Sequence, residues 1–288
     1  MTLNSSLAPC PMCGNFGPMH LASKKVSGKA YSLSVCTRCG QHYCDPAPTA
    51  EEIVGFYQGD FHRDLRQDGG TERIFGPKFS RYRDWVVTFL QSGRSMDVGT
   101  ATGLFPSMLK AAGFDAEGTE YNPASAEWGA AHYGIRIRVG GLEQIASELD
   151  TFDLITMTDV LEHTEHPLHA LQAASRSLKS RGHMLITFPD VRSVESAYQR
   201  KLARLTGRDW IWECCHIPLH VWEFTPDTGR AMFEKAGFDV VGFRRSQVAR
   251  EHLPGIAGLL CLPLKALTVP MLAHSIGTQM AFMIRKRV

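Results

Sequence analysis

Short apolar runs alternate with amphipathic segments from residue 94 to the end of the chain. Strands are predicted at 95–99, 115–120, 135–139, 152–160, 183–188, 238–245 and 277–286, and helices at 104–113, 123–134, 167–178 and 226–237. This alternation predicts an α/β fold, a mostly parallel sheet of seven strands with helices on both faces. Such sheets bind ligands beyond the carboxyl ends of their strands.

The first strand runs into a loop with two glycines. The sequence is SMDVGTATGLF (95–105), with Gly99 and Gly103 four residues apart and Ala101 between them. Dinucleotide binding asks for G-x-G-x-x-G, because the pyrophosphate needs a close backbone approach. The missing glycine therefore counts against a pyrophosphate. Asp97 would repel a phosphate but can accept a hydrogen bond from an ammonium group, so we expect a cofactor that is positively charged here.

A second acidic residue stands at the end of the next predicted strand. Glu120 follows Gly99 by 21 residues, and a carboxylate at this place can accept hydrogen bonds from both hydroxyls of a ribose. A nucleoside with a free ribose and an amino-acid tail satisfies both acids. This description fits S-adenosylmethionine.

Residues 94–245 resemble a class I S-adenosylmethionine-dependent methyltransferase. The similarity is carried, in order, by DVGTATG, GTEYNP, FDLITMTDVLEHTEHP, LKSRGHMLITFP and HVWEFTPDTGRAMFEKAGFDVV. It implies a Rossmann-like seven-stranded methyltransferase sheet. It also implies that Asp97 faces the methionine amino group and that Glu120 holds the ribose. The remaining cofactor contacts that it implies are Gly99, Thr100, Ala101 and Gly103 beneath the cofactor, Tyr121 and Leu142 at the adenine, and Asp159 beside the methyl group; Tyr121, Leu142 and Asp159 could equally be core or cap residues.

Four of the eight cysteines form two C-x-x-C-G pairs, Cys10 with Cys13 and Cys36 with Cys39, separated by 22 residues. Two such pairs can bind a metal tetrahedrally, which suits Zn²⁺. Residues 1–20 lack the pattern of a secretory signal, so metal binding is favoured over disulfides. Four protein ligands leave no open position, so the zinc is expected to be structural. His42 and Cys44 are interpreted as ordinary residues near the site.

This N-terminal arrangement resembles the zinc ribbon that precedes the catalytic domain of bacterial methyltransferases of glycan and natural-product pathways. We therefore divide the chain into a zinc ribbon (1–45), a helical connector (46–92) and a methyltransferase domain (93–288). Residues 1–45 show many turn formers and little periodicity. The clearest connector helix is expected at 80–90, and the resemblance suggests that the region 57–62 reaches the substrate side.

Three residues are candidates for removing a proton from the acceptor. Glu162 and His163 follow the fourth predicted strand, and His220 precedes the last helix. Histidine suits this work because its pKa lies near neutrality. His220 is preferred, because the segment before it carries Trp210 and Trp212 and could cover the substrate, whereas Glu162 and His163 could equally cap a helix. The histidines at 163, 166 and 169 are interpreted as a polar helix start rather than as metal ligands, and the segment 214–216 as three ordinary residues.

The predicted function is methyl transfer from S-adenosylmethionine to a small-molecule or glycan acceptor, on oxygen, in the cytoplasm. Two alternatives are an RNA base methyltransferase and a protein that binds S-adenosylmethionine without catalysis. A formal net charge of +2, without a run of five like charges, disfavours a nucleic-acid partner. The apolar segment 253–273 contains three prolines and a lysine, which argues against a membrane span. It is expected to insert before the last strand and either pack on the domain or touch a membrane surface weakly.

Overall fold

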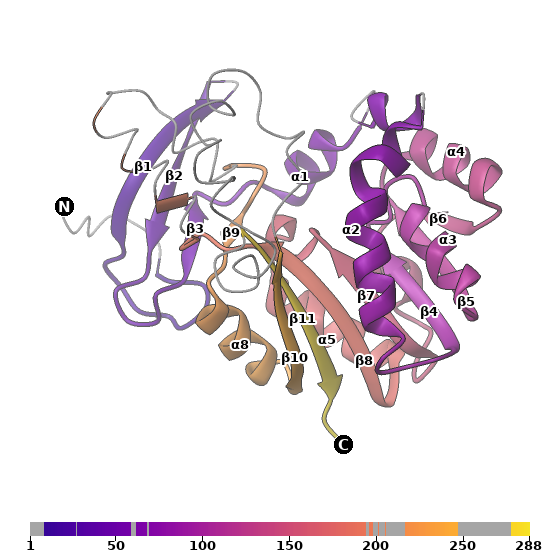
Figure 1. The fold of residues 1–288 in the computed structure, drawn as a ribbon. Coiled ribbons are helices and arrows are strands. Elements are labelled where there is room, and N and C mark those ends of the chain that lie inside the picture. Colours follow the sequence, from indigo (N-terminus) through magenta and orange to yellow (C-terminus); the bar gives the residue numbers. More distant parts are fainter. Residues whose placement is uncertain are drawn as a thin grey trace.

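The structure is a computed structural model that describes residues 9–26, 28–58, 62–67, 69–193, 196, 197, 201, 205, 217–246 and 278–288. These residues form a large sheet with flanking helices and a smaller sheet beside it (Figure 1). The predicted insertion at 253–273 and the segment 214–216 lie outside the described residues. Among the helices of the described ranges, none combines the length and the apolar character needed to cross a membrane.

The large sheet has seven strands in the order β10-β11-β8-β7-β4-β5-β6. Their bounds are β4 Gly93–Val98, β5 Phe114–Glu120, β6 Arg136–Val139, β7 Phe152–Thr158, β8 Leu178–Pro189, β10 Phe238–Ser246 and β11 Gln279–Lys286. Strands β4 to β8 pair in parallel, whereas β11 runs antiparallel to both β8 and β10. The predicted fold class, with its seven strands, is confirmed.

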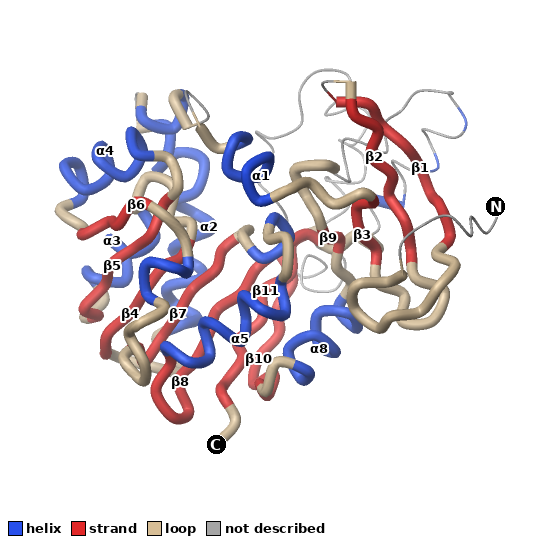
Figure 2. The backbone as a smooth tube through the Cα atoms, turned by 180° about the vertical axis from the view of Figure 1, so that it is seen from behind, coloured by secondary structure: helices blue, strands red, loops and turns tan. Residues whose placement is uncertain are grey.

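Helices cover both faces of this sheet (Figures 1 and 2). On one face lie α2 (Gly70–Val86) and α3 (Leu104–Ala111), and on the other α5 (Pro167–Ser177) and α8 (Pro226–Lys235); α4 (Pro123–Tyr133) packs beside β6. The alternation of β8 explains the two cores. Met184, Ile186 and Phe188 join the apolar cluster of α5 and α8, whereas Leu185 joins that of α2 and α3.

The connector consists of α1 (Ala50–Phe56), a 3₁₀ turn η1 (Asp64–Arg66) and α2. Thr49 caps α1 in a capping box with Glu52, the start that the sequence indicates. Helix α2 begins ten residues before the predicted start at residue 80. The first turns of α2 were not predicted from the sequence, because they contain Pro77 and proline usually interrupts a helix.

The smaller sheet has the order β1-β2-β3-β9 and is antiparallel throughout. Its strands are β1 Met19–Val26, β2 Lys29–Val35, β3 His42–Asp45 and β9 Trp222–Glu223. The hairpin of β1 and β2 has no clear signal in the sequence. The first three strands lie within the predicted zinc ribbon, residues 1–45, whereas β9 lies within the predicted methyltransferase domain, residues 93–288. The small sheet is therefore built from both predicted domains.

Candidate active site

A cavity of about 500 Å³ lies at the carboxyl ends of β4, β5 and β7. The loop after β4, the ends of β5 and β7, helices α1 and α2, and the 3₁₀ turn η3 (Leu161–His163) supply its walls. This is the edge at which a parallel sheet of this kind binds ligands. Of the cofactor residues predicted from the sequence, the cavity is lined by Gly99, Thr100, Ala101, Glu120, Tyr121 and Asp159.

The loop after β4 turns sharply on its glycines. Gly99 has φ +70°, and a Cβ atom placed on it would lie 2.7 Å from Val160 Cγ2. Gly103 has φ +84°, and a Cβ atom there would lie 2.9 Å from Ile137 Cδ1. Both positions need glycine for conformation and for space. Ala101 also adopts a left-handed conformation, with φ 52°.

Glu120 is held at the end of β5 by backbone donors. Its Oε2 accepts from the N–H of Ala101 and its Oε1 from the N–H of Asn122, each at 2.8 Å. Each oxygen keeps a second lone pair, so the carboxylate can still accept from the two hydroxyls of a ribose. Burial raises the pKa of Glu120 to about 7, although the backbone hydrogen bonds lower it.

Asp97 lies behind the loop and is fully buried. Its Oδ1 accepts from the hydroxyl of Thr156 at 2.5 Å, whereas its Oδ2 has no hydrogen-bond partner among the described residues. Burial raises the pKa of Asp97 to about 7. A buried carboxylate oxygen without a partner suits a cationic group or a bridging water, so the residues present fit the amino-acid end of S-adenosylmethionine.

Besides Asp97, which lies behind the loop, two predicted cofactor residues do not line the cavity. Gly103 begins α3 beneath the loop, and Leu142 packs against the apolar core, while its neighbour Gly141 lines the cavity. Tyr121 reaches the wall and donates a hydrogen bond from its hydroxyl to Glu143 at 3.2 Å. Tyr121 and Gly141 therefore both line the cavity, just beyond the ends of β5 and β6.

Asp159, at the end of β7, is fixed by three donors from different elements. Lys78 of α2, Thr187 of β8 and Gln279 of β11 all bond its carboxylate, the Thr187 hydroxyl at 2.8 Å. Burial raises the pKa of Asp159, but Lys78 outweighs this effect and holds it below its usual value. Burial lowers the pKa of Lys78, but the negative charge of Asp159 outweighs burial, so the pKa of Lys78 is raised above its usual value. The backbone of Asp159 is left-handed, with φ 59°.

The three candidate bases lie together. One ligand atom from each of Glu162, His163 and His220 lies within 4.8 Å of the others. His163 lines the cavity, and His220 packs behind it with the two ring centroids 4.7 Å apart and the rings nearly perpendicular. Glu162 is buried, and burial together with the charge of Asp159 raises its pKa well above the usual value.

The two histidines have different environments. His163 Nδ1 donates to the carbonyl oxygen of Leu219 at 2.9 Å, so the lone pair of the neutral ring is on Nε2. His220 Nδ1 is hydrogen-bonded to Glu223 Oε1 at 3.1 Å. Burial lowers the pKa of His220 to about 4. His163 is therefore the one of the pair that an acceptor in the cavity can reach.

The connector supplies cavity residues that the sequence did not identify individually. Tyr57 of the α1 C-terminus lies edge-on to His163, with ring centroids 5.8 Å apart. Phe75 and Phe79 of α2 line the same wall. The region 57–62 was expected near the substrate, and its Tyr57 and His62 are in the wall. Lys78 could not be recognised as a site residue from the sequence, because its burial depends on how α2 packs against the sheet.

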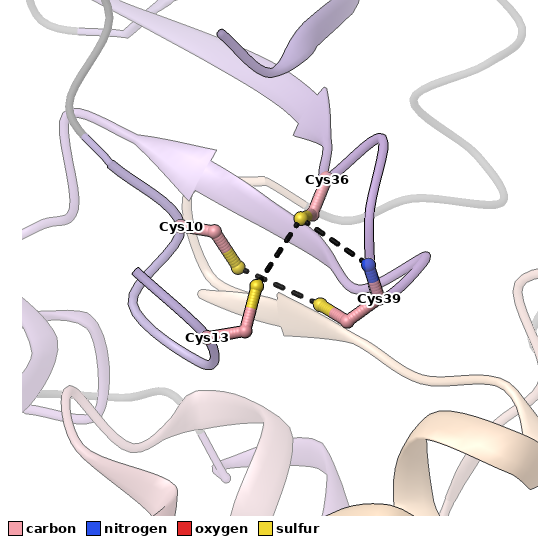
Figure 3. Close-up of side chains that lie close together, drawn as sticks. All are labelled: Cys10, Cys13, Cys36 and Cys39. Atoms are coloured by element: carbon pink, nitrogen blue, oxygen red, sulfur yellow. Dashed lines mark hydrogen bonds between the residues drawn. The ribbon is translucent and has the colours of Figure 1, made fainter. Parts of the chain in front are cut away.

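The two C-x-x-C pairs meet at one point beside β9 (Figure 3). The Sγ atoms of Cys10 and Cys39 are 3.7 Å apart and those of Cys13 and Cys36 are 3.5 Å apart; all four lie within 4.8 Å of one another. Zn–S bonds of about 2.3 Å in a tetrahedron give S···S separations of about 3.8 Å. The backbone N–H groups of Arg38 and Cys39 point to Cys36 Sγ at 3.4 Å. The cluster therefore fits a tetrahedral thiophilic metal ion.

This topology, with buried acids at the ends of β4 and β5 around a nucleoside-sized cavity, defines the class I methyltransferase fold. The model of the family described as "Methyltransferase domain" matches residues 74–242, more than half of the chain, and the chain belongs to this family. It is an S-adenosylmethionine-dependent methyltransferase.

The individual relatives share less than 30% sequence identity with this chain. A ubiquinone biosynthesis O-methyltransferase of Cereibacter sphaeroides (strain ATCC 17025 / ATH 2.4.3) is 28% identical over 183 residues, which cover 61% of this chain and 71% of the relative. The solved structure of a SAM-dependent methyltransferase of Thermotoga maritima is similar with a TM-score of 0.52 at 19% identity, covering 80% of this chain and all of that one. One from Archaeoglobus fulgidus has a TM-score of 0.52 at 15% identity, covering 75% and 97%. These structural likenesses concern the fold.

Proposed function

We propose that the protein methylates an oxygen of a small-molecule or glycan acceptor, with His163 as the proton acceptor. The observation that carries the proposal is the position of His163 in the cavity wall, with its Nδ1–H engaged by Leu219 and its lone pair on Nε2. The sequence favoured His220, but this ring lies behind His163 and burial holds its pKa near 4. We therefore assign His220 to holding the ring of His163.

S-adenosylmethionine supplies an electrophilic methyl group on a sulfonium centre. Glu120 would hold the ribose and Asp97 the amino group, which fixes the cofactor relative to the end of β7. His163 would take the acceptor's hydroxyl proton onto Nε2 as the oxygen attacks the methyl carbon and the carbon–sulfur bond breaks. Alignment and proton removal are what the protein must add, because the donor is already reactive.

The walls near His163 support an acceptor with an apolar body. Tyr57, Phe75 and Phe79 face the cavity together with Ile53 and Val54. Apolar and aromatic walls with a few polar groups are typical of small-molecule sites. The relative in Cereibacter sphaeroides is named an O-methyltransferase, which supports oxygen as the atom that receives the methyl group.

The test measures release of S-adenosylhomocysteine with a panel of hydroxylated aromatic compounds, sugar nucleotides and RNA. His163→Gln should lower kcat by about 100-fold or more, the usual contribution of a general base, with unchanged S-adenosylmethionine affinity in calorimetry. His166→Gln is the matched control, because His166 is exposed near the start of α5. Turnover of His163→Gln within threefold of the parent would contradict the base, and turnover on RNA alone would contradict the acceptor class.

We further propose that Cys10, Cys13, Cys36 and Cys39 hold one structural Zn²⁺. The support is the spacing of the four sulfurs and the backbone donors around Cys36. Elemental analysis of the purified protein should give one zinc per chain. Cys36→Ser should lose it, and Cys44→Ser, a buried thiol outside the cluster, should keep it. Full zinc content in Cys36→Ser would contradict the assignment.

A further inference from the structure

We propose that the four-stranded sheet with the cysteine cluster is a positioning element of methyl transfer. It holds a bridging segment, residues 219–223, and this segment in turn holds His163. The inference rests on the proposed function, because it gives the sheet a task in that reaction. In both views β9, which forms the end of the bridging segment, lies beside β3 (Figures 1 and 2).

The bridging segment is bonded to the small sheet along one side. His42 pairs with Glu223, and Tyr43 with Trp222. The N–H of Cys44 donates to the carbonyl of Val221 at 2.8 Å. The side-chain amide of the fully buried Gln41 donates to the carbonyls of His42 at 2.8 Å and of Glu223 at 3.0 Å.

The same few residues are bonded to the active site on the other side. The N–H of Val221 donates to the carbonyl of Glu162 at 2.8 Å. The carbonyl of Leu219 accepts the Nδ1–H of His163, and the ring of His220 packs against that of His163. A displacement of the segment would therefore move the partner that sets the orientation and tautomer of His163.

The cysteine cluster is joined to the small sheet through the turn between β2 and β3. The N–H of Cys36 donates to the carbonyl of Gln41 at 2.9 Å, and the N–H of Gly40 to the carbonyl of Cys36 at 3.0 Å. The turn that presents Cys36 and Cys39 therefore also places Gln41. Cys10, Cys36 and Tyr43 belong to the same apolar cluster as β7 and β8, so the small sheet is packed onto the catalytic domain.

The cofactor residues are held by other elements. Thr156 of β7 bonds Asp97, and the backbone of Ala101 and Asn122 bonds Glu120. Breaking the hydrogen bonds between the small sheet and the bridging segment should therefore impair the transfer step and spare cofactor affinity. This selectivity distinguishes a positioning role from a general contribution to stability.

The test compares Gln41→Met with Leu33→Ala in the full-length, metal-containing protein. Gln41→Met removes both amide donors, whereas Leu33→Ala opens the core of β2 on the hairpin side. The acceptor-independent readout is the NMR signal of the His163 Nδ1 proton, assigned by its absence in His163→Gln. We expect Gln41→Met to shift or lose this signal and to lower kcat about tenfold, with the Kd for S-adenosylmethionine unchanged within twofold. Leu33→Ala should leave the signal and kcat as they are.

An unchanged His163 signal in Gln41→Met would overturn the inference, as would an equal shift in Leu33→Ala or a parallel loss of cofactor affinity. If Gln41→Met does not fold, zinc is removed from the parent protein with a chelator and the same signal is followed; an unaltered signal again overturns the inference. The proposed function fails separately, when His163→Gln retains turnover. The NMR signal decides the positional coupling in either case.

Discussion

Among single residues, Ala101 is the one at which the loop sequence departs from the glycine pattern of dinucleotide-binding loops. It stands between Gly99 and Gly103 and adopts φ 52°, where an L-residue costs about 1 kcal/mol relative to its ordinary conformations. Its N–H donates to the carboxylate of Glu120 at 2.8 Å. The bond that orders Glu120 therefore requires the strained conformation, as is common at functional sites.

Ala101→Gly should raise the free energy of unfolding by about 0.5–1 kcal/mol, because glycine enters the left-handed region without a steric penalty. Ala111→Gly is the control. This residue is exposed in α3, where glycine should lower the free energy of unfolding by about 1 kcal/mol. Urea denaturation measures both values. Destabilisation of the same size in the two variants would show that the backbone at Ala101 is not strained.

Cofactor affinity should depend on pH because burial raises the pKa of both Asp97 and Glu120 to about 7. A cationic cofactor binds the ionised carboxylates, so protonation competes with binding as the pH falls below 7. Each acid contributes about eightfold, so calorimetry should give a Kd for S-adenosylmethionine about 70-fold higher at pH 6 than at pH 7.5. Glu120→Gln should weaken binding at pH 7.5 and reduce this dependence. A Kd that is the same at both pH values contradicts the assignment of the two acids.

At the scale of elements, α2 is more than part of a connector. It carries Phe75 and Phe79 into the cavity wall, and between them Lys78 bonds Asp159 at the end of β7. The Lys78 ammonium also lies 5.8–5.9 Å from the ring centroids of Phe75, Phe79 and Tyr82. The helix is thus attached to the active-site edge of the sheet by a largely buried ion pair.

Lys78→Met should lower the free energy of unfolding by about 3 kcal/mol, because it leaves the carboxylate of Asp159 without its counter-ion. The side chains of Lys78 and Asp159 are 14% and 34% exposed. The double variant with Asp159→Asn should recover part of the loss. Lys179→Met is the control, since its pair with Asp153 is more exposed at 47% and 27% and should matter by less than about 1 kcal/mol. Equal losses in the two single variants would contradict a special role of the buried pair.

The helices that begin with a capping residue can be predicted from the local sequence. Thr49, Asn122 and Thr225 cap α1, α4 and α8, and each start is readable because the capping side chain and the following proline or acid are adjacent in sequence. The start of α2 and the hairpin of β1 and β2 are not readable in this way. Helix α2 is stabilised by packing Tyr82 and Trp85 against α3 and the sheet, and the hairpin depends on partners that are distant in sequence.

At the scale of the whole molecule, the two sheets are one packed structure. Strand β9, the end of the bridging segment, belongs to the small sheet, yet helix α8 of the catalytic domain begins only three residues after it. Val221 and Trp222 are buried there. A boundary drawn at residue 45 from composition separates strands that are hydrogen-bonded to each other.

A truncated chain, residues 46–288, should therefore not retain the stability of the parent. Removing β1 to β3 exposes Val221 and Trp222 and leaves β9 without a partner strand. We expect a melting temperature lower by about 10 °C or more in calorimetry, with increased binding of a hydrophobic dye. A chain without Val288, which is 92% exposed, is the control and should melt like the parent. Unchanged melting of the 46–288 chain would show that the small sheet is an independent appendage.

Patterns within the sequence were enough to predict the seven-stranded sheet, the ligand edge after Val98 and the joint site of the two C-x-x-C motifs. These depend on patterns that are short-range, such as the alternation of apolar residues, a glycine that allows a left-handed turn, or two thiols on one knuckle. The three-dimensional arrangement was needed to show which histidine faces the cavity, that Lys78 bonds Asp159, and that β9 completes the small sheet. These facts join positions that lie 56 to 181 residues apart. They are set by how packed elements meet, which local chemistry does not specify.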